Sequence, residues 1–374
     1  MIYLDNAATT VPDEGAVNAA LAYLKPYGCL NPSALYRAGF EAHKAIDEAR
    51  RVLLSFVVPQ GGYELVFTGS GSEADNQAIF SSAKRGNFVT TSGEHAAIYN
   101  SAKELEKRGV EVRFAPLNGD GSVDAQALLK LVDDKTSLVS VIHVNNETGA
   151  VNDIAALAAR VKKINAGTIF HSDGVQAFGK IPFTLTKDID LYTVSAHKIG
   201  GIRGAAALIR RKGAKLLPYI FGGGQENGLR SGTENTFAIK QFEFAARKKF
   251  ASLKEDFSRI QGYNRRVRQG LDASIFEILS AESASPYILS VSAKGLRGEV
   301  LLHMLDDAGL MVGTGSACSS KSRFSRVMLA CGLDEKRADG VLRLSFASST
   351  TQEEVTSAIE ILNKTAAALA ERTR

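Results

Sequence analysis

Between residues 60 and 210, short apolar runs alternate with segments of helix length. Several of the runs are almost continuously apolar, which is typical of strands buried on both faces. The segments between them, such as 96–108 and 153–164, carry alanine, leucine and isoleucine at helical spacing. This alternation predicts a mostly parallel sheet with helices on both sides. The predicted strands are 64–68, 87–91, 110–114, 137–144, 168–172, 190–195 and 204–209.

The pattern changes near residue 236, where a long helical stretch begins and runs to about 275. A shorter α+β pattern follows this stretch. Its predicted elements are strands at 287–292 and 342–346 and helices at 298–309 and from 351 onward. The sequence therefore predicts an α/β fold in two parts. We expect a large domain over 14–248 and a smaller domain formed by 1–13 and 249–374.

The composition is that of an ordinary globular protein. Of the 374 residues, 45% are hydrophobic and 23% are charged, which excludes a disordered or fibrous chain. No apolar run approaches the roughly 18 residues of a membrane helix, and Asp5 interrupts the N-terminal segment, so neither a membrane span nor a signal peptide is expected. The three cysteines, Cys29, Cys318 and Cys331, are too scattered for a disulfide framework or a zinc site. We expect no metal and a reducing, cytoplasmic location.

The net charge of +5 permits an anionic ligand or an RNA partner but requires neither. Basic residues gather in the helical stretch 236–275. A solvated helix face is the favoured interpretation, because no nucleic-acid recognition motif accompanies them. We therefore expect no direct binding of nucleic acid.

Polar or ionisable side chains follow five of the predicted strands. Ligands of open α/β sheets bind beyond the carboxyl ends of the strands, so these groups are expected to meet at one edge. One such coincidence would carry little weight, but five together predict a site. The groups are the loop 68–73 (TGSGSE), Glu94 and His95, the run 145–147 (NNE), Asp173 and Gln176, and His197 and Lys198.

The chemistry of these groups is specific when they are taken together. A Gly/Ser loop that runs from a strand into a helix is suited to cradle a phosphate, although a plain turn is equally compatible with 68–73. Lys198 could be an exposed loop lysine, but a desolvated lysine can form a Schiff base. Asp173 could be a helix cap, or it could keep a pyridine nitrogen protonated. His95 could cap a helix, or it could stack on a ring and move protons. A phosphate cradle, a lysine and an aspartate describe a pyridoxal-phosphate site.

The string Ser195-Ala196-His197-Lys198 resembles the Ser-x-His-Lys motif of class V aminotransferase-like enzymes, and the whole chain resembles a cysteine desulfurase of the NifS/IscS type. The matching segments are collinear and cover nearly the whole sequence. They are 3–10 (YLDNAATT), 31–34 (NPSA), 67–76 (FTGSGSEADN), 94–95 (EH), 143–149 (HVNNETG), 171–180 (HSDGVQAFGK), 195–201 (SAHKIGG), 222–235 (GGGQENGLRSGTEN), 313–320 (GTGSACSS) and 342–346 (LRLSF). The resemblance implies the aspartate-aminotransferase-like fold, with a large seven-stranded domain and a smaller α+β domain.

The resemblance also assigns roles to residues. Lys198 would hold pyridoxal 5'-phosphate, and Asp173 and Gln176 would bind its ring nitrogen and phenolic oxygen. His95 would stack on the ring and act in catalysis. The phosphate would be held by Gly71, Ser72, Ser195 and His197, joined by Thr233 of a second subunit in a homodimer. Asn146 would contact the cofactor and also the substrate L-cysteine, which Arg343 and Asn31 would bind as well.

Cys318 lies in a run of small polar residues, 313–322, with little to pack against. Such surroundings suit an exposed, attacking thiolate. Cys331 has apolar neighbours and is predicted to be a core residue, whereas Cys29 stays ambiguous. The resemblance implies that Cys318 takes the sulfur of L-cysteine as a persulfide and that alanine is released.

The segment between Cys318 and Arg343 has the length typical of relatives that pass sulfur to another protein. The expected acceptor is an iron–sulfur scaffold or an enzyme of tRNA or cofactor thiolation. Two alternatives stay open at this point. A selenocysteine lyase or aminotransferase of the same fold would not need Cys318, and a catalytically silent sulfur-relay subunit would bind no cofactor.

Overall fold

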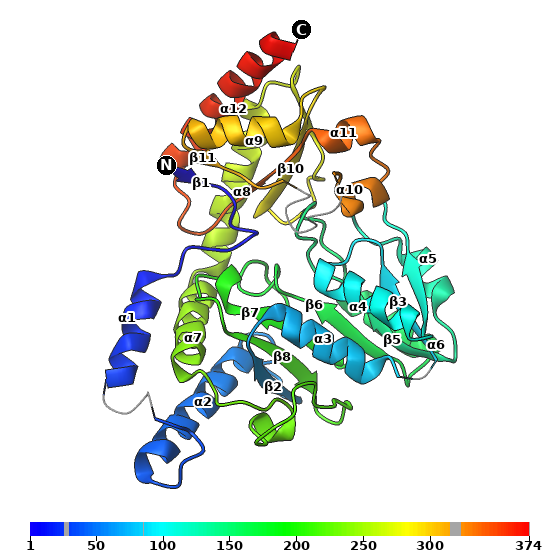
Figure 1. Cartoon of the computed structure of the whole chain (residues 1–374), viewed down its shortest axis with the longest axis vertical. Helices are drawn as coiled ribbons and strands as arrows, with labels where there is room; N and C mark the ends of the chain where they lie inside the picture. The colour runs from blue at the N-terminus through cyan, green and yellow to red at the C-terminus, as the bar shows by residue number, and fades with distance from the viewer. Residues whose placement is uncertain (26–29, 85, 315–322, 374) are drawn as a thin grey trace.

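The computed structural model describes residues 1–25, 30–84, 86–314 and 323–373. Two groups of elements, shown in Figure 1, are joined by the N-terminal segment and by one long helical segment. The larger group contains α1 (Glu14–Tyr23), α2 (Arg37–Ser55), β2 (Tyr63–Thr68), α3 (Gly71–Ser82), β3 (Asn87–Thr91), α4 (Ala96–Lys107), β4 (Glu111–Ala115), α5 (Ala125–Leu131), β5 (Thr136–Ser140), α6 (Ile154–Ile164), β6 (Ile169–Asp173), β7 (Leu191–Ser195), the 3-10 turn η2 (Ala196–Lys198), β8 (Ala206–Arg211), the 3-10 turn η3 (Glu226–Gly228) and α7 (Thr236–Ala251).

The smaller group begins with the N-terminal strand and continues after α7. Its elements are β1 (Ile2–Tyr3), α8 (Leu253–Gly270), β9 (Phe276–Ile278), β10 (Ile288–Ala293), α9 (Gly298–Asp307), β11 (Leu310–Met311), α10 (Arg326–Ala330), α11 (Glu335–Asp339), β12 (Val341–Ser345) and α12 (Gln352–Thr373). The predicted helical stretch 236–275 is two helices, because the chain changes course at Ser252, between α7 and α8. The predicted domain boundary at 248 stays a prediction.

The central sheet has the strand order β2-β8-β7-β6-β5-β3-β4. The pairs from β7 to β4 are parallel, whereas β8 is antiparallel to both of its neighbours. All seven strands predicted in this region are present, and the sheet is mostly parallel as expected. The predicted strand 137–144 ends earlier, at Ser140. Beyond it, Val141 N and His143 N still donate to main-chain oxygens of β6, but Ile142 N donates to the Glu94 carboxylate at 3.0 Å instead of to β3. Since six strands point the same way, their carboxyl ends form one edge.

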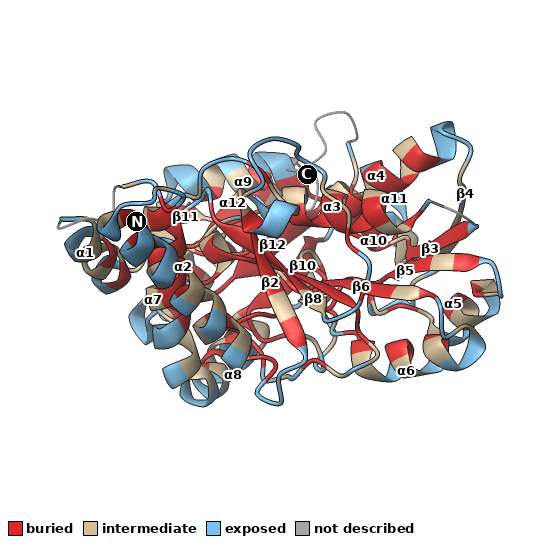
Figure 2. Ribbon diagram, turned by 90° about the horizontal axis from the view of Figure 1, so that it is seen from below, coloured by how far each residue is buried: buried red, intermediate tan, exposed pale blue. Residues whose placement is uncertain are grey.

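Helices cover both faces of this sheet, and Figure 2 shows the strands buried between them. Side chains of α2, α5, α6 and α7 pack in the largest apolar cluster, which includes the fully buried Phe170 and Phe242. On the other face, α3 and α4 pack over Phe88 and Leu138. Burial of each large apolar side chain contributes about 1.5–3 kcal/mol, so these two layers hold the sheet edge in place. A separate cluster, centred on β10, β12, α8 and α12, fills the smaller group.

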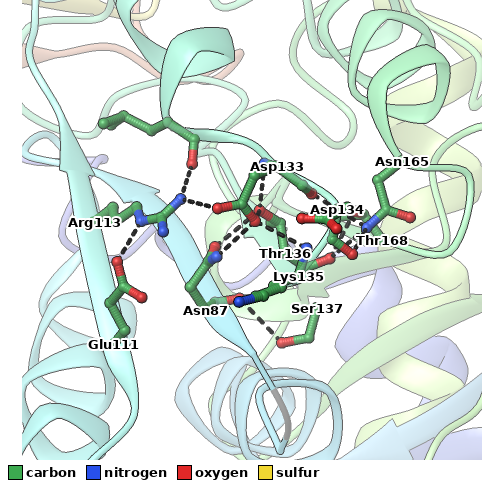
Figure 3. Close-up of polar contacts among 11 residues, drawn as sticks. Asn87, Glu111, Arg113, Asp133, Asp134, Lys135, Thr136, Ser137, Asn165 and Thr168 are labelled. Atoms are coloured by element: carbon green, nitrogen blue, oxygen red, sulfur yellow. Dashed lines mark hydrogen bonds and ion pairs between the residues drawn. The ribbon is translucent and has the colours of Figure 1, made fainter.

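The edge of the sheet opposite the strand carboxyl ends is fixed by polar contacts around Asp133 (Figure 3). Its carboxylate accepts hydrogen bonds from Arg113 Nη1 at 2.8 Å, from Asn87 Nδ2 at 2.9 Å and from Lys135 N at 2.9 Å. These donors hold the pKa of Asp133 well below its usual range, with the Arg113 contact as the largest cause. Asn87 and Thr136 begin β3 and β5, so this cluster sets the start of both strands and leaves their far ends for the site.

Candidate functional site

A cavity of about 300 Å³ lies at the carboxyl edge of the sheet. Ten of the predicted site residues line it, which confirms that the strand ends converge. They are Gly71, Ser72, His95, Asn146, Asp173, Gln176, Ser195, His197, Lys198 and Arg343. Ala7 and Ala8 of the N-terminal segment also line the cavity, so the smaller group closes one side of it.

Lys198 is the last residue of η2, directly after β7. Its Nζ donates to the main-chain oxygens of Ala7 at 2.6 Å and Ala8 at 2.8 Å. The oxygen of His197 accepts from Thr10 N at 2.8 Å, which ties the same N-terminal segment to the turn. Lys198 is therefore held at the cavity wall by carbonyls that can bind either protonation state of its amine, and its side chain is half-buried.

Asp173 ends β6 and is buried. One carboxylate oxygen accepts from Val175 N at 2.9 Å, which fixes its direction toward the cavity. Burial raises its pKa, while His95 and Lys198 act against the rise. The next residue must be small, since a Cβ on Gly174 would lie 1.9 Å from the Cζ of Tyr192. A buried carboxylate in this position is suited to pair with a cationic ring nitrogen.

His95 caps the N-terminus of α4, where its Nδ1 accepts from Ala97 N at 3.2 Å. The capping role and the cavity position are therefore combined in one residue. Burial lowers the pKa of His95, so its ring is neutral at physiological pH. A ring atom of His95 and carboxylate oxygens of Asp75 and Asp173 all lie within 4.8 Å of one another. Asp75 was not predicted as a site residue.

The start of α3 and the end of β7 form a cradle for an anion. Ser70 caps α3, and a Cβ on Gly71 would lie 3.2 Å from Val175 Cγ2, so a small residue is needed there. The Ser195 hydroxyl is buried and makes no hydrogen bond within the described part of the chain. A buried unpaired hydroxyl beside a helix N-terminus matches the needs of a phosphate group. Burial also lowers the pKa of His197 to about 4, so this ring contributes as a neutral donor.

Arg343 enters the cavity from β12, in the smaller group. It is 5% exposed, and its Nη1 donates to Asn146 O at 2.9 Å while Nη2 donates to Asp5 Oδ1 at 2.8 Å. Its Nε is buried and finds no acceptor among the described residues. Among the described residues, Nη1 and Nη2 therefore have acceptors, whereas the Nε donor has none.

Cys318 and Cys29 lie outside the described residues, but the chain on both sides of Cys318 is fixed near the cavity. Before it, Gly313 N donates to Arg343 O at 2.9 Å, and Arg343 N donates to Gly313 O at 2.8 Å. After it, the Ser325 hydroxyl donates to the Glu147 carboxylate. Glu147 belongs to the strand-end run 145–147 that the sequence singled out. The described residues on the two sides of Cys318 therefore contact Arg343, which lines the cavity, and Glu147, which is next to the lining residue Asn146.

Three predicted residues lie elsewhere or differ in burial. Asn31 is exposed, and its Oδ1 accepts from Ser33 N at 2.9 Å. Thr233 is also exposed, and neither residue belongs to the lining of this cavity. Cys331 was predicted as a core residue, but it is half-buried against a small apolar cluster because it ends the short helix α10 at the surface. Burial nevertheless raises its pKa to about 12, so its thiol stays protonated.

Sequence reasoning missed the residues that reach the cavity from behind its wall or from the N-terminal segment. Asp5, Ala7 and Ala8 follow no predicted strand of the large sheet, and their presence depends on how the two groups of elements pack. Asp75 lies inside α3, four positions after Gly71, so a one-turn spacing from the glycine loop is the signal that could have found it.

Comparisons with known proteins agree with this geometry. The family model Aminotransferase class-V matches residues 2–357. The chain belongs to this family. It is 36% identical to "Cysteine desulfurase IscS 1" of Archaeoglobus fulgidus, over 97% of this chain and 96% of that protein. It is 37% identical to "Cysteine desulfurase IscS" of Photorhabdus laumondii, over 99% of this chain and 94% of that protein.

Solved structures show the same likeness. A "NIFS-LIKE PROTEIN" superposes with a TM-score of 0.91 at 32% identity, covering 98% of this chain and 100% of that one. "SspA in complex with cysteine" superposes with a TM-score of 0.80 at 28% identity, covering 94% of this chain and 100% of that one. The expected aspartate-aminotransferase-like fold and the relationship to NifS/IscS cysteine desulfurases are confirmed, and the family is pyridoxal-phosphate-dependent.

Proposed function

We propose that this protein is a pyridoxal-phosphate-dependent cysteine desulfurase. It converts L-cysteine to L-alanine and takes the sulfur onto Cys318 as a persulfide, so that one thiol and one cysteine give one persulfide and one alanine. The observation that carries the proposal is the convergence of Lys198, Asp173, His95 and Arg343 on one cavity beside the anion cradle of α3. Amine, carboxylate, imidazole, guanidinium and cradle are the groups that this chemistry requires.

The residues of the site divide the work between binding and proton transfer. Pyridoxal phosphate, when bound, supplies an electron sink that weakens bonds at the α and β carbons of an amino acid. Lys198 would hold it and exchange a proton with the substrate Cα. Asp173 would supply the negative charge for its ring nitrogen, and Gln176 would donate to its ring oxygen. Its phosphate would be held by Gly71, Ser72, Ser195 and His197.

The remaining groups serve the substrate. The buried guanidinium of Arg343, with Asn146 at its side, would bind the carboxylate of L-cysteine, because its Nε has no acceptor among the described residues. His95 is neutral and lies at the cavity wall, so it can accept the proton of the Cys318 thiol. Cys318 would then attack the substrate sulfur as a thiolate.

A homodimer is part of the proposal. Thr233 is exposed and outside the cavity of its own chain, as expected for a residue that completes a neighbour's phosphate site. Large apolar side chains are also exposed in two segments. Leu35 and Phe40 near the start of α2 are 103% and 63% exposed, and Phe221 in the loop after β8 is 81% exposed. Clustered exposure of this kind marks surfaces that bind protein. We propose that Asn31, in the first of these segments, serves the partner's site or its substrate entrance.

The sulfur acceptor is proposed to be a second protein, either an iron–sulfur scaffold or an enzyme of tRNA or cofactor thiolation, in the cytoplasm. The flanks of the Cys318 segment are anchored at the cavity edge through Gly313 and Ser325, which supports delivery from this edge. Of the helices in the described part of the chain, none has the length and apolar character to cross a bilayer.

The test of the proposal is the stoichiometry of products from L-cysteine. Purified protein loaded with pyridoxal phosphate and supplied with a thiol reductant should release alanine and sulfide in equal amounts. Lys198→Ala should stop both, whereas Lys212→Ala, which removes an exposed loop lysine, should stop neither. Amino transfer that depends on an added α-keto acid would support the aminotransferase alternative, a strong preference for selenocysteine would support the lyase, and failure to bind the cofactor would support a silent relay subunit.

A further inference from the structure

Lys180 is a buried lysine that the proposed chemistry does not use. It follows β6 by seven positions and is 5% exposed. Its Nζ donates to Gln176 Oε1 at 2.8 Å, which is its hydrogen bond within the described part of the chain. No carboxylate pairs with it among the described residues. A buried amine without a counter-ion is costly, so a role at the site is a natural explanation.

The contact of Lys180 continues into the cavity through one amide. The Gln176 Nε2 donates to Ala7 O at 2.9 Å, and Lys198 Nζ donates to the same oxygen at 2.6 Å. Lys180, Gln176, Ala7 and Lys198 are therefore linked by three consecutive hydrogen bonds. The link runs from the buried amine to the lysine proposed to hold the cofactor.

The direction of the Gln176 amide decides what it can offer to a ligand. An amide has two N–H donors on nitrogen and an acceptor on oxygen, and the two ends have nearly the same shape. The main-chain oxygen of Ala7 can only accept, so the end of the amide that faces it is Nε2. The other end is then Oε1, and Lys180 holds the amide in this direction by donating to it. The nitrogen then faces the cavity, where one N–H binds Ala7 O and the other is left for a ligand.

We propose that Lys180 is a positioning residue that fixes the Gln176 amide with its nitrogen toward the ring oxygen of pyridoxal phosphate. This inference rests on the proposed function for the identity of the ligand. Lys180 would contact neither the cofactor nor the substrate, and its effect on the cofactor would be exerted through Gln176.

The electrostatic surroundings of Lys180 agree with this role. Burial lowers its pKa, and the positive groups that face it, Lys198 after β7, Lys249 on α7 and Arg343 on β12, lower it further. Among the described residues, the charged groups that shift the pKa of Lys180 are all positive, whereas the Gln176 oxygen accepts a hydrogen bond from its amine. Lys249 provides a control, because it is a half-buried lysine whose charge also acts on Lys180, and Gln176 is hydrogen-bonded to Lys180 and not to it.

The experiment measures the visible absorption of bound pyridoxal phosphate as a function of pH, together with the dissociation constant of the cofactor. Loss of a donor to the ring oxygen makes the bound group more basic, so the midpoint of the absorption change moves to higher pH. Lys180→Met should raise the midpoint and weaken cofactor binding about tenfold. Lys249→Met should leave the midpoint near that of the wild type.

A double-mutant cycle separates positioning from simple charge. Gln176→Met should raise the midpoint by itself, and Lys180→Met should add nothing in that background. An equal shift by Lys180→Met in the wild-type and Gln176→Met backgrounds would overturn the proposal, since Lys180 would then act by charge alone. A midpoint unchanged by Lys180→Met would also overturn it.

A second variant keeps the test open if Lys180→Met does not fold. Lys180→Gln is neutral but retains an N–H donor, so it should keep a midpoint near that of the wild type. A large upward shift in Lys180→Gln would contradict positioning by hydrogen bonding. The measurement also distinguishes the two proposals. A wild-type protein that binds no pyridoxal phosphate refutes the proposed function. If the wild type binds it but the midpoint shifts of Lys180→Met and Gln176→Met add, only the role of Lys180 is refuted.

Discussion

The guanidinium of Arg343 is paired with the carboxylate of Asp5, with 2.8 Å between Nη2 and Oδ1. The pair joins β12 to the N-terminal segment at the wall of the cavity. Arg343 is thereby held in place, and its Nε has no acceptor among the described residues. The pair is buried enough that breaking it without replacement leaves a charge unpaired.

The first prediction follows from this pair. Arg343→Gln should raise the KM for L-cysteine about 10- to 100-fold, because a charge-assisted hydrogen bond to the substrate is lost. The kcat should change less, since the interaction is present in both the ground state and the transition state. Asp5→Asn is the control: it keeps an oxygen that can accept from Arg343, so a smaller rise is expected. An unchanged KM in Arg343→Gln would remove Arg343 from the substrate site.

The second prediction concerns the two cysteines in the C-terminal third of the chain. Cys318→Ser should abolish alanine formation while the visible absorbance of the bound cofactor stays intact. Cys331→Ser should leave turnover near that of the wild type, because burial keeps the Cys331 thiol protonated, with a pKa of about 12. Alanine release and absorbance spectra of both variants provide the measurement. Full turnover by Cys318→Ser would show that another group accepts the sulfur.

The third prediction tests the anion cradle with one substitution that should weaken cofactor binding without destabilising the apoprotein. Ser195→Ala should weaken pyridoxal-phosphate binding about 3- to 10-fold, because a hydrogen bond to the phosphate is lost. The same substitution should not lower the melting temperature of the cofactor-free protein, since the buried hydroxyl has no partner among the described residues. Cofactor titration and thermal melting of the apoprotein measure the two effects. A destabilised apoprotein with normal cofactor affinity would assign Ser195 to the fold instead.

The sequence predicts the sheet and most of the cavity for the same physical reason. Strands buried on both faces must be apolar runs, and parallel strands must present their carboxyl ends together, so Asp173, Lys198 and His95 could be expected at one edge. The end of β5 at Ser140 could not be predicted, because it depends on a hydrogen bond from Ile142 N to the carboxylate of Glu94. That contact joins segments 48 positions apart and leaves no local pattern.

The contribution of the smaller group was the least predictable. Arg343 was assigned through a family resemblance, but its pairing with Asp5 joins residues 338 positions apart. Lys180 was part of a matching segment and carried no role, since an isolated lysine after a strand is usually solvated. Its bond to Gln176 spans only four positions, but its burial depends on tertiary packing. Local patterns predict elements, whereas such contacts depend on tertiary packing.

The fourth prediction concerns pH and stability. Burial raises the pKa of Glu94 from 4.5 to about 8, although Thr91 Oγ1 and Ile142 N both donate to its Oε1. Between these pH values the unfolded chain releases the proton and the folded chain keeps it, so this group lowers stability as pH rises, by at most about 1.4 kcal/mol per pH unit. Glu94→Gln keeps the acceptor and removes the titration.

The difference in unfolding free energy between Glu94→Gln and the wild type should therefore grow in favour of the variant from pH 5 to about 8 and level off above it. Denaturant unfolding of the cofactor-free proteins over this range measures it. A difference that stays constant with pH would show that Glu94 is ionised in the folded protein.

The central claim is that cysteine sulfur moves to the thiol of Cys318 by means of the amine of Lys198. The most direct measurement is peptide mass spectrometry. The cofactor-loaded protein is first exposed briefly to L-cysteine without reductant, and the remaining free thiols are blocked afterwards. The account predicts one additional sulfur atom on the Cys318 peptide of the wild type, none on that peptide in Lys198→Ala, and none on the Cys331 peptide. An unmodified Cys318 peptide in a protein that has released alanine would contradict it.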